Sequence, residues 1–202
     1  MKIIHTEYIT SAGQFPDSKK WESVKKDIHK AIKSIEWPTG SGSFTLHEES
    51  GKKRREGNGV KPIKLAFMEK LKHLGWNLET PVDIASVKRP GPMDATFPID
   101  DKLFCVEWET GNISSSHRAL NKMALGIIKN ILIGGILILP TRNMYSYLTD
   151  RVGNYPEIEP YFPLWKALQV KEGILAVIAI EHDGVSKDVP RIPKGTDGRA
   201  LQ

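Results

Sequence analysis

The spacing of apolar residues changes near residue 79. Before it, apolar positions recur every three to four residues, and we predict amphipathic helices over residues 17–35 and 62–74. After it, short apolar runs alternate with polar turns, as strands do. Strands are predicted over 82–87, 103–108, 131–139 and 174–180, with helices over 115–128, 144–151 and 157–168. This order predicts an α/β (α+β) fold, a central mixed β-sheet flanked by helices.

The pattern predicts one domain over residues 1–202, because 40% of the 202 residues are hydrophobic and can form one core. Two segments lack the pattern. Residues 191–202 are polar and are predicted to be an irregular tail. Residues 39–60 are rich in Gly, Ser and basic residues. Their composition favours a solvated loop, and the alternative is a mobile basic loop near DNA phosphates.

Composition adds expectations about partners and location. The net charge of +5 and pI of about 9.2 suit a polyanionic partner. The single cysteine, Cys105, excludes an intramolecular disulfide and fits a reducing cytoplasm; its apolar surroundings indicate a buried thiol. The longest apolar run, residues 127–139, is too short and too interrupted to span a membrane. We therefore expect a cytoplasmic protein with no membrane association.

Three acidic residues form the first motif with a chemical interpretation. Twelve residues separate Pro-Met-Asp94 from Glu107-Trp-Glu109. Side chains alternate across a strand, so Glu107 and Glu109 are expected on one face, and Val106 and Trp108 on the other. Two adjacent carboxylates are favourable if a divalent cation lies between them. An isolated Glu-x-Glu would indicate solvated acids, but the preceding Pro-x-Asp favours a metal site. Oxygen ligands favour Mg²⁺.

A second group of polar residues follows directly. Gly111 permits a turn, and the serines at 114–116 are candidate N-caps of the next helix, which would begin beside the carboxylates and suit a phosphate. Asn112 can pair with adenine and Arg118 with guanine in the major groove. The alternative is a capped helix with a surface arginine. The adjacent acid and arginine at 150 and 151 fit an ordinary surface ion pair, and the alternative is that they read a G·C pair.

Together these segments resemble the PD-(D/E)xK nuclease core and, more specifically, the BamHI-type restriction endonucleases, especially their compact members. The resemblance runs over residues 37–198. Beyond the acidic motif, it rests on ETGNISSSHR at 109–118, YLTDRVGN at 147–154, EPYF at 159–162, IPKGTDG at 192–198 and NGVKPIK at 58–64.

The resemblance implies a role for each matching position. Asp94, Glu107 and Glu79 would hold Mg²⁺, with Mn²⁺ as a substitute. Glu109 would act on the attacking water and stands where most of the superfamily has lysine. DNA contacts are implied for Asn112, Ser114, Arg118, Asp150, Arg151, Lys64, Asp197 and Gly198.

The expected function is that of a type II restriction endonuclease, a homodimer that cuts both strands of double-stranded DNA at a palindrome. The helix from residue 115 and the segment from residue 157 are the expected dimer surfaces by analogy. The base readers and the resemblance predict G^GATCC with four-base 5′ overhangs. The host is expected to carry a cognate DNA methyltransferase that forms no stable complex with the nuclease.

Two other functions fit the same fold. One is a nuclease of DNA repair or recombination with looser specificity, against which the set of base readers argues. The other is a non-catalytic DNA-binding protein, against which the intact acidic triad argues.

Overall fold

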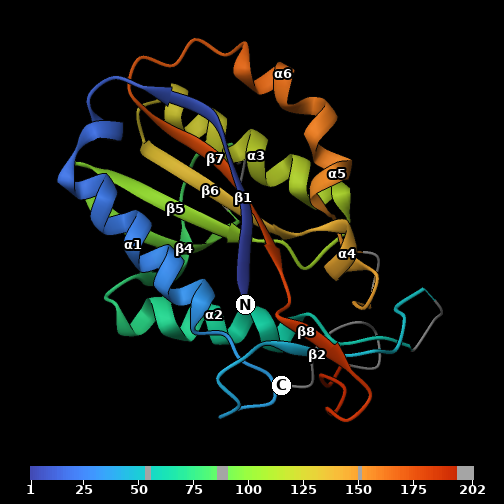
Figure 1. Ribbon diagram of the computed structural model, residues 1–202. Coiled ribbons are helices and arrows are strands. Elements are labelled where there is room, and N and C mark those ends of the chain that lie inside the picture. Colours follow the sequence, from blue (N-terminus) through green and yellow to red (C-terminus); the bar gives the residue numbers. More distant parts are fainter. Residues whose placement is uncertain (53–55, 86–90, 150–151, 195–202) are drawn as a thin grey trace.

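A six-stranded mixed sheet forms the middle layer of the molecule (Figure 1), and the structure, a computed structural model, describes residues 1–52, 56–85, 91–149 and 152–194. Strands β5, β6 and β7 are parallel, whereas β1, β3 and β4 run antiparallel to their neighbours. The mixed sheet is therefore confirmed. In spatial order its strands are β1 (Lys2–Ala12), β7 (Gly173–Glu181), β6 (Leu132–Pro140), β5 (Lys102–Trp108), β4 (Pro92–Ile99) and β3 (Asn77–Pro81).

Helices cover both faces of this sheet and create two hydrophobic cores (Figure 1). Phe104, Val106 and Trp108 of β5 pack in the core with α1 (Lys19–Lys33) and α2 (Lys61–His73). Cys105, between them, packs in the core with α3 (Ile113–Ile128). The alternation expected of this strand is confirmed. Cys105 is the predicted buried thiol, and burial raises its pKa well above the usual value.

The two N-terminal helices form where the apolar spacing predicts them. In α1, Ser18 caps the first turn by accepting a hydrogen bond from the Trp21 N–H over 3.1 Å. Lys30 and Lys33 lie in its last turn, where cations offset the helix dipole. Helix α2 has a proline in its first turn and ends before Gly75, whose φ of +89° suits glycine.

Prolines break the helix that the sequence predicts over residues 157–168. The structure has three short pieces there, α5 (Tyr155–Ile158), a 3-10 turn η2 (Glu159–Tyr161) and α6 (Phe162–Lys166), each with a proline in its first turn. Proline suits a first turn and disrupts a helix interior, so each piece ends as the next begins. The helix predicted over 144–151 is likewise only a short α4 (Arg142–Tyr145), and residues 150–151 lie outside the described part.

The strand predicted from residue 82 is wrong. Pro81 ends β3, and Val82 and Ile84 are buried outside any strand, in the core under α3. An apolar run bounded by turns fits either environment, which explains the error. Residues 86–87 of that predicted strand are outside the described residues.

Some elements were not predicted. Strand β1 is at an edge and has mostly exposed or half-buried side chains. The segment 39–60 contains β2 (Thr45–His47), which pairs in parallel with β8 (Gly184–Ser186). A turn η1 (Phe15–Asp17) precedes α1. Residues 191–194 are irregular, as expected for the tail. None of the described helices is both long and apolar enough to cross a membrane.

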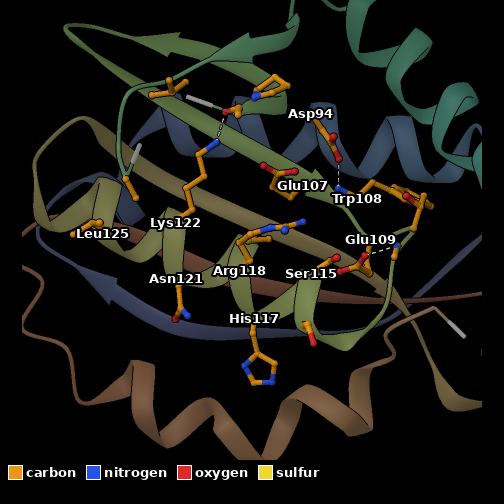
Figure 2. Close-up of a pocket in the computed structure, with 18 of the residues that line it drawn as sticks. Asp94, Glu107, Trp108, Glu109, Ser115, His117, Arg118, Asn121, Lys122 and Leu125 are labelled. Atoms are coloured by element: carbon orange, nitrogen blue, oxygen red, sulfur yellow. Dashed lines mark hydrogen bonds between the residues drawn. The ribbon is translucent and has the colours of Figure 1, made fainter. Parts of the chain in front are cut away.

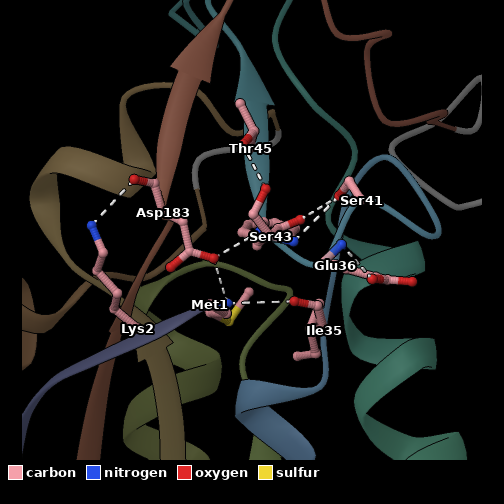
Figure 3. A network of polar contacts seen from close by, with 10 residues as sticks. Met1, Lys2, Ile35, Glu36, Ser41, Ser43, Thr45 and Asp183 are labelled. Carbon is pink, nitrogen blue, oxygen red and sulfur yellow. Dashed lines mark hydrogen bonds and ion pairs between the residues drawn. The ribbon is translucent and has the colours of Figure 1, made fainter.

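The N-terminal ammonium is buried and ties three parts of the fold together (Figure 3). Met1 donates to the Asp183 carboxylate over 2.8 Å and to the Ile35 carbonyl over 3.4 Å. The same Asp183 oxygen accepts from the Phe44 N–H over 2.7 Å. Burial opposes the charge of Asp183, but these hydrogen bonds and the ammonium outweigh it, and the pKa of Asp183 is lowered.

Candidate active site

A cleft of about 1090 Å³ opens between strands β4 and β5 and helix α3. Asp94, Glu107 and Glu109 line it from the side of the strands, and Arg118 and Lys122 line it from α3 (Figure 2). Acidic groups on the sheet therefore face basic groups on the helix.

Asp94, which is buried, and Glu107, which is half-buried, form a pair of carboxylates on neighbouring strands. One Asp94 oxygen accepts from the Trp108 backbone N–H over 2.7 Å, and the other accepts from Lys64 over 2.5 Å. The Glu107 carboxyl is hydrogen-bonded to Asp94. Burial and, next, the charge of Asp94 raise the pKa of Glu107 to about 8. The pair therefore tends to hold one proton when no other cation is near.

Glu109 lies just beyond the end of β5, and its carboxylate turns toward the start of α3. Its Oε1 accepts from the Gly111 N–H over 2.5 Å, and its Oε2 accepts from the Ser116 hydroxyl over 2.6 Å. Burial raises the pKa of Glu109, although both hydrogen bonds act in the opposite direction. Glu107 and Glu109 line the same cleft, but their carboxylates have different partners. Glu107 is paired with Asp94, whereas Glu109 is bound to Gly111 and Ser116.

The Asp94–Glu107 pair fits a magnesium ion by the chemistry of its donors. A divalent cation would offset the burial and the repulsion from Asp94 that together raise the pKa of Glu107. In the described part of the chain, no group of three or more His, Cys, Asp or Glu side chains lies close enough together to hold a metal on its own. Mg²⁺ is commonly held by one or two protein carboxylates, and substrate phosphate and water complete its coordination.

Glu79 is not among the residues that line the cleft. Its side chain is exposed. The β3–β4 register passes from Leu78 opposite Ala95 to Thr80 opposite Met93, which puts the Glu79 backbone across from Asp94. Glu79 has a φ of +48°, a left-handed conformation that non-glycine residues rarely adopt and that is found disproportionately at functional sites. Its role as a metal ligand remains a prediction.

Helix α3 begins beside the acids, as the sequence predicts, but its cap differs. Asn112 is the N-cap and accepts from the Ser114 N–H over 3.1 Å, whereas serines at 114–116 were expected to cap it. The helix starts earlier because Asn112, in an extended conformation, directly follows the turn at Gly111. Asn112, Ser114 and Arg118 are all exposed and remain predicted base readers.

Lys122 is a cleft residue that the sequence analysis did not single out. Ser114, Arg118 and Lys122 follow at intervals of four residues and line the same wall. Extending the helical period from Arg118 would have identified it. Lys122 donates to the Gly91 carbonyl and, together with Lys64, acts to lower the pKa of Glu107. The cleft thus has basic groups on both sides of the acidic pair.

Four predicted DNA contacts lie outside the described residues, namely Asp150, Arg151, Asp197 and Gly198. Lys64 is placed in the cleft, bound to Asp94.

Comparison with known proteins adds independent findings. The family model described as "Restriction endonuclease BamHI" matches residues 1–199. The chain is 50% identical to the type II restriction enzyme OkrAI of Oceanobacter kriegii over all 202 residues of both proteins. It is 32% identical to the type II restriction enzyme BamHI of Bacillus amyloliquefaciens, over 96% of this chain and 92% of that protein.

The fold has a solved neighbour as well. The crystal structure of the restriction endonuclease BglII with a DNA 16-mer superposes with a TM-score of 0.63 at 13% identity, covering 95% of this chain and 88% of that one. At this identity the likeness concerns the fold alone.

Proposed function

Because the chain belongs to the BamHI family of type II restriction endonucleases and is a site-specific deoxyribonuclease, we propose that it cuts both strands of GGATCC after the first G, with Mg²⁺ and as a homodimer. The observation that carries the metal dependence is the Asp94–Glu107 pair of carboxylates, which lies in a cleft beside the start of α3. Mn²⁺ is expected to substitute for Mg²⁺.

The cleft supports a division of labour in hydrolysis. Asp94 and Glu107 would hold the metal, with Glu79 as a further ligand on resemblance. When bound, Mg²⁺ neutralises charge on the scissile phosphate and lowers the pKa of water. Glu109 orients the attacking water. As the water oxygen bonds to phosphorus, the water gives up one proton to the solvent and the bond from phosphorus to the 3′ oxygen breaks. The 3′ oxygen takes up one proton from the solvent, which leaves a 5′ phosphate and a 3′ hydroxyl.

Basic residues around the acids suit a phosphate substrate. Lys64, Arg118 and Lys122 all line the cleft, and their charges offset that of the DNA backbone. The N-terminus of α3 adds backbone N–H groups at the same place.

The specificity proposal rests on base-reading chemistry and on the family. Arg118 is exposed on α3, where its guanidinium can pair bidentately with a guanine. Asn112 keeps its amide NH₂ and a second lone pair on Oδ1 for adenine, even while it caps the helix. Asp150 and Arg151 are proposed to read the remaining G·C pair. Each lost bidentate contact should cost about 1–3 kcal/mol of discrimination.

A homodimer follows from the need to cut two strands at a two-fold symmetric site. Tyr161 and Leu164, in the segment expected at the dimer surface, are 50% and 64% exposed. The His117 ring of α3 contacts Tyr161 with ring centroids 4.5 Å apart, so the two expected dimer elements form one continuous surface.

A plasmid digest tests the proposal directly. Wild-type protein with Mg²⁺ should give discrete fragments whose sequenced ends read G^GATCC, and excess EDTA should stop cleavage. Glu107→Ala should fold but should not cut, because it loses a proposed metal ligand. Ends outside GGATCC would contradict the specificity alone, a smear would indicate a nuclease of loose specificity, and cutting in EDTA would contradict the metal.

Arg118→Ala isolates base reading from phosphate binding. Cleavage of the cognate site should fall far more than salt-sensitive binding to unrelated DNA. An equal loss on both DNAs would make Arg118 a phosphate contact instead.

A further inference from the structure

The Glu109 carboxylate is fixed by a small buried corner between β5 and α3. Its two oxygens accept from the Gly111 N–H and the Ser116 hydroxyl. Ser116 is completely buried, so water does not compete for its hydroxyl. The direction in which Glu109 faces the cleft is therefore set by these two donors.

A distant segment of the chain closes the same corner. The Gly153 N–H donates to the Gly111 carbonyl over 2.8 Å. A Cβ added at Gly153 would lie 2.6 Å from the Ser116 hydroxyl oxygen and 3.2 Å from the Ile113 Cα. Only glycine permits so close an approach, which brings the backbone at 153 against the residue that holds Glu109.

This segment carries the proposed base readers. On the other side of residues 150–151, the Thr149 N–H donates to the Asn58 carbonyl over 2.9 Å, and Thr149 is 4% exposed. Residues 150–151 therefore lie in the sequence between Thr149 and Gly153, whose backbone N–H groups are both hydrogen-bonded to other parts of the fold. Gly153 is the one that contacts the residues around Glu109. A shift of the backbone at Gly153 would disturb its contacts with Gly111 and Ser116.

We propose that Ser116 is a positioning residue for Glu109, and that Gly153 couples the base-reading segment to it, so that correct base contacts orient the catalytic carboxylate. The inference rests on the proposed function. A misplacement of about 1 Å in a catalytic group can lower the rate by about 100-fold, so a small shift at a mismatched site would suffice.

The alternative is that Ser116 merely satisfies a buried carboxylate. That structural role would slow the cutting of every DNA equally. With coupling, the cognate site is cut faster than other sites, and this difference in rate is lost when the contacts among Glu109, Ser116 and Gly153 are altered. The cognate rate divided by the rate at a site with one altered base pair distinguishes the two roles.

The experiment compares Gly153→Ala, Ser116→Ala and the double variant with wild type. Single-turnover cleavage is measured at the site that the wild-type digest defines and at a one-base variant of it. DNA affinity is measured in EDTA. Gly184→Ala is the control, because its added Cβ would meet only the Thr45 side chain, at 3.7 Å or more.

Both single variants should lower the cognate rate by about 10- to 100-fold and lower the cognate-to-variant ratio, with DNA affinity within about threefold of wild type. In the double variant the Ser116 hydroxyl, which is the nearest atom to the new Cβ, is gone and only the contact with the Ile113 backbone remains. The double variant should therefore be about as slow as Ser116→Ala, and not slower by the full effect of Gly153→Ala. Equal losses at both sites, or additive effects in the double variant, would overturn the coupling. If Gly153→Ala does not fold, the ratio for Ser116→Ala decides alone. A wild-type protein that cuts no defined site would contradict the proposed function instead.

Discussion

Lys64 and Asp94 form an ion pair in the wall of the cleft, with Nζ and Oδ1 2.5 Å apart. Their side chains are only 19% and 11% exposed, so solvent screens the pair poorly. Lys64 thus neutralises the charge of Asp94, and a metal ion bound to Asp94 and Glu107 would neutralise the same charge. The lysine and a metal ion therefore have overlapping electrostatic roles.

Lys64→Met should destabilise the metal-free protein, because it leaves Asp94 without its cation. The expected loss is on the order of 3 kcal/mol. Mg²⁺ should raise the Tm of this variant more than that of wild type, since the ion replaces the missing charge. Thermal unfolding with and without Mg²⁺ measures this, and Lys72→Met, an exposed lysine on the same helix, is the control. An identical Mg²⁺ effect on variant and wild type would argue against a metal at Asp94.

Glu109→Lys should bind DNA but cut it very slowly or not at all. A lysine accepts no hydrogen bonds, so the Gly111 N–H and the Ser116 hydroxyl lose their acceptor. Asp94→Asn should also bind DNA, because it removes a negative charge near the phosphates. Filter binding and cleavage of the same duplex separate the two effects. A wild-type rate from Glu109→Lys would show that glutamate has no special role there.

The sequence predicts strand β5 and its chemistry well because a strand has a strict two-residue period. Val106 and Trp108 enter one core, while Glu107 faces the cleft with Cys105 on the α3 side. Each of these positions follows from local alternation alone.

The partners of the acids could not be predicted in the same way. Ser116 lies in α3 and donates to Glu109, which is on the other side of the turn at Gly111. Lys64 lies in α2, 30 residues before Asp94, to which it donates. Such contacts depend on how elements pack, which local periodicity does not encode. Strand β1 escaped prediction for a related reason, because its edge position leaves most side chains partly exposed and hides the apolar alternation.

Leu164→Asp should shift the proposed dimer toward monomer. Leu164 is 64% exposed in the expected dimer surface, where a buried carboxylate would be costly. Leu65→Asp is the matched control, since Leu65 is 55% exposed on α2. Sedimentation at several concentrations measures the state. Dissociation by the control and not by Leu164→Asp would put the interface on α2.

Asp183→Asn should lower the free energy of unfolding by about 2 kcal/mol at pH 7, because it weakens hydrogen bonds to a charged group. The pKa of Asp183 is lower in the folded protein, so its stabilisation is present above the unfolded pKa of about 4 and is lost as pH falls through the folded pKa. The gap between wild type and variant should therefore narrow in acid. Urea unfolding at several pH values measures it, with exposed Asp188→Asn as the control. A gap independent of pH would contradict the assigned cause.

The place of β7 between β6 and β1 has a consequence for the synthesis of this nuclease. The first residues of the chain pair with some of the last, Lys2 opposite Glu181. A nascent chain on the ribosome therefore lacks the partner of its first strand until β7 has emerged. Chains that end before residue 173 would leave both cores open and would be substrates for proteases rather than active enzymes. Incomplete translation products should thus pose little danger to the DNA of the cell that makes them.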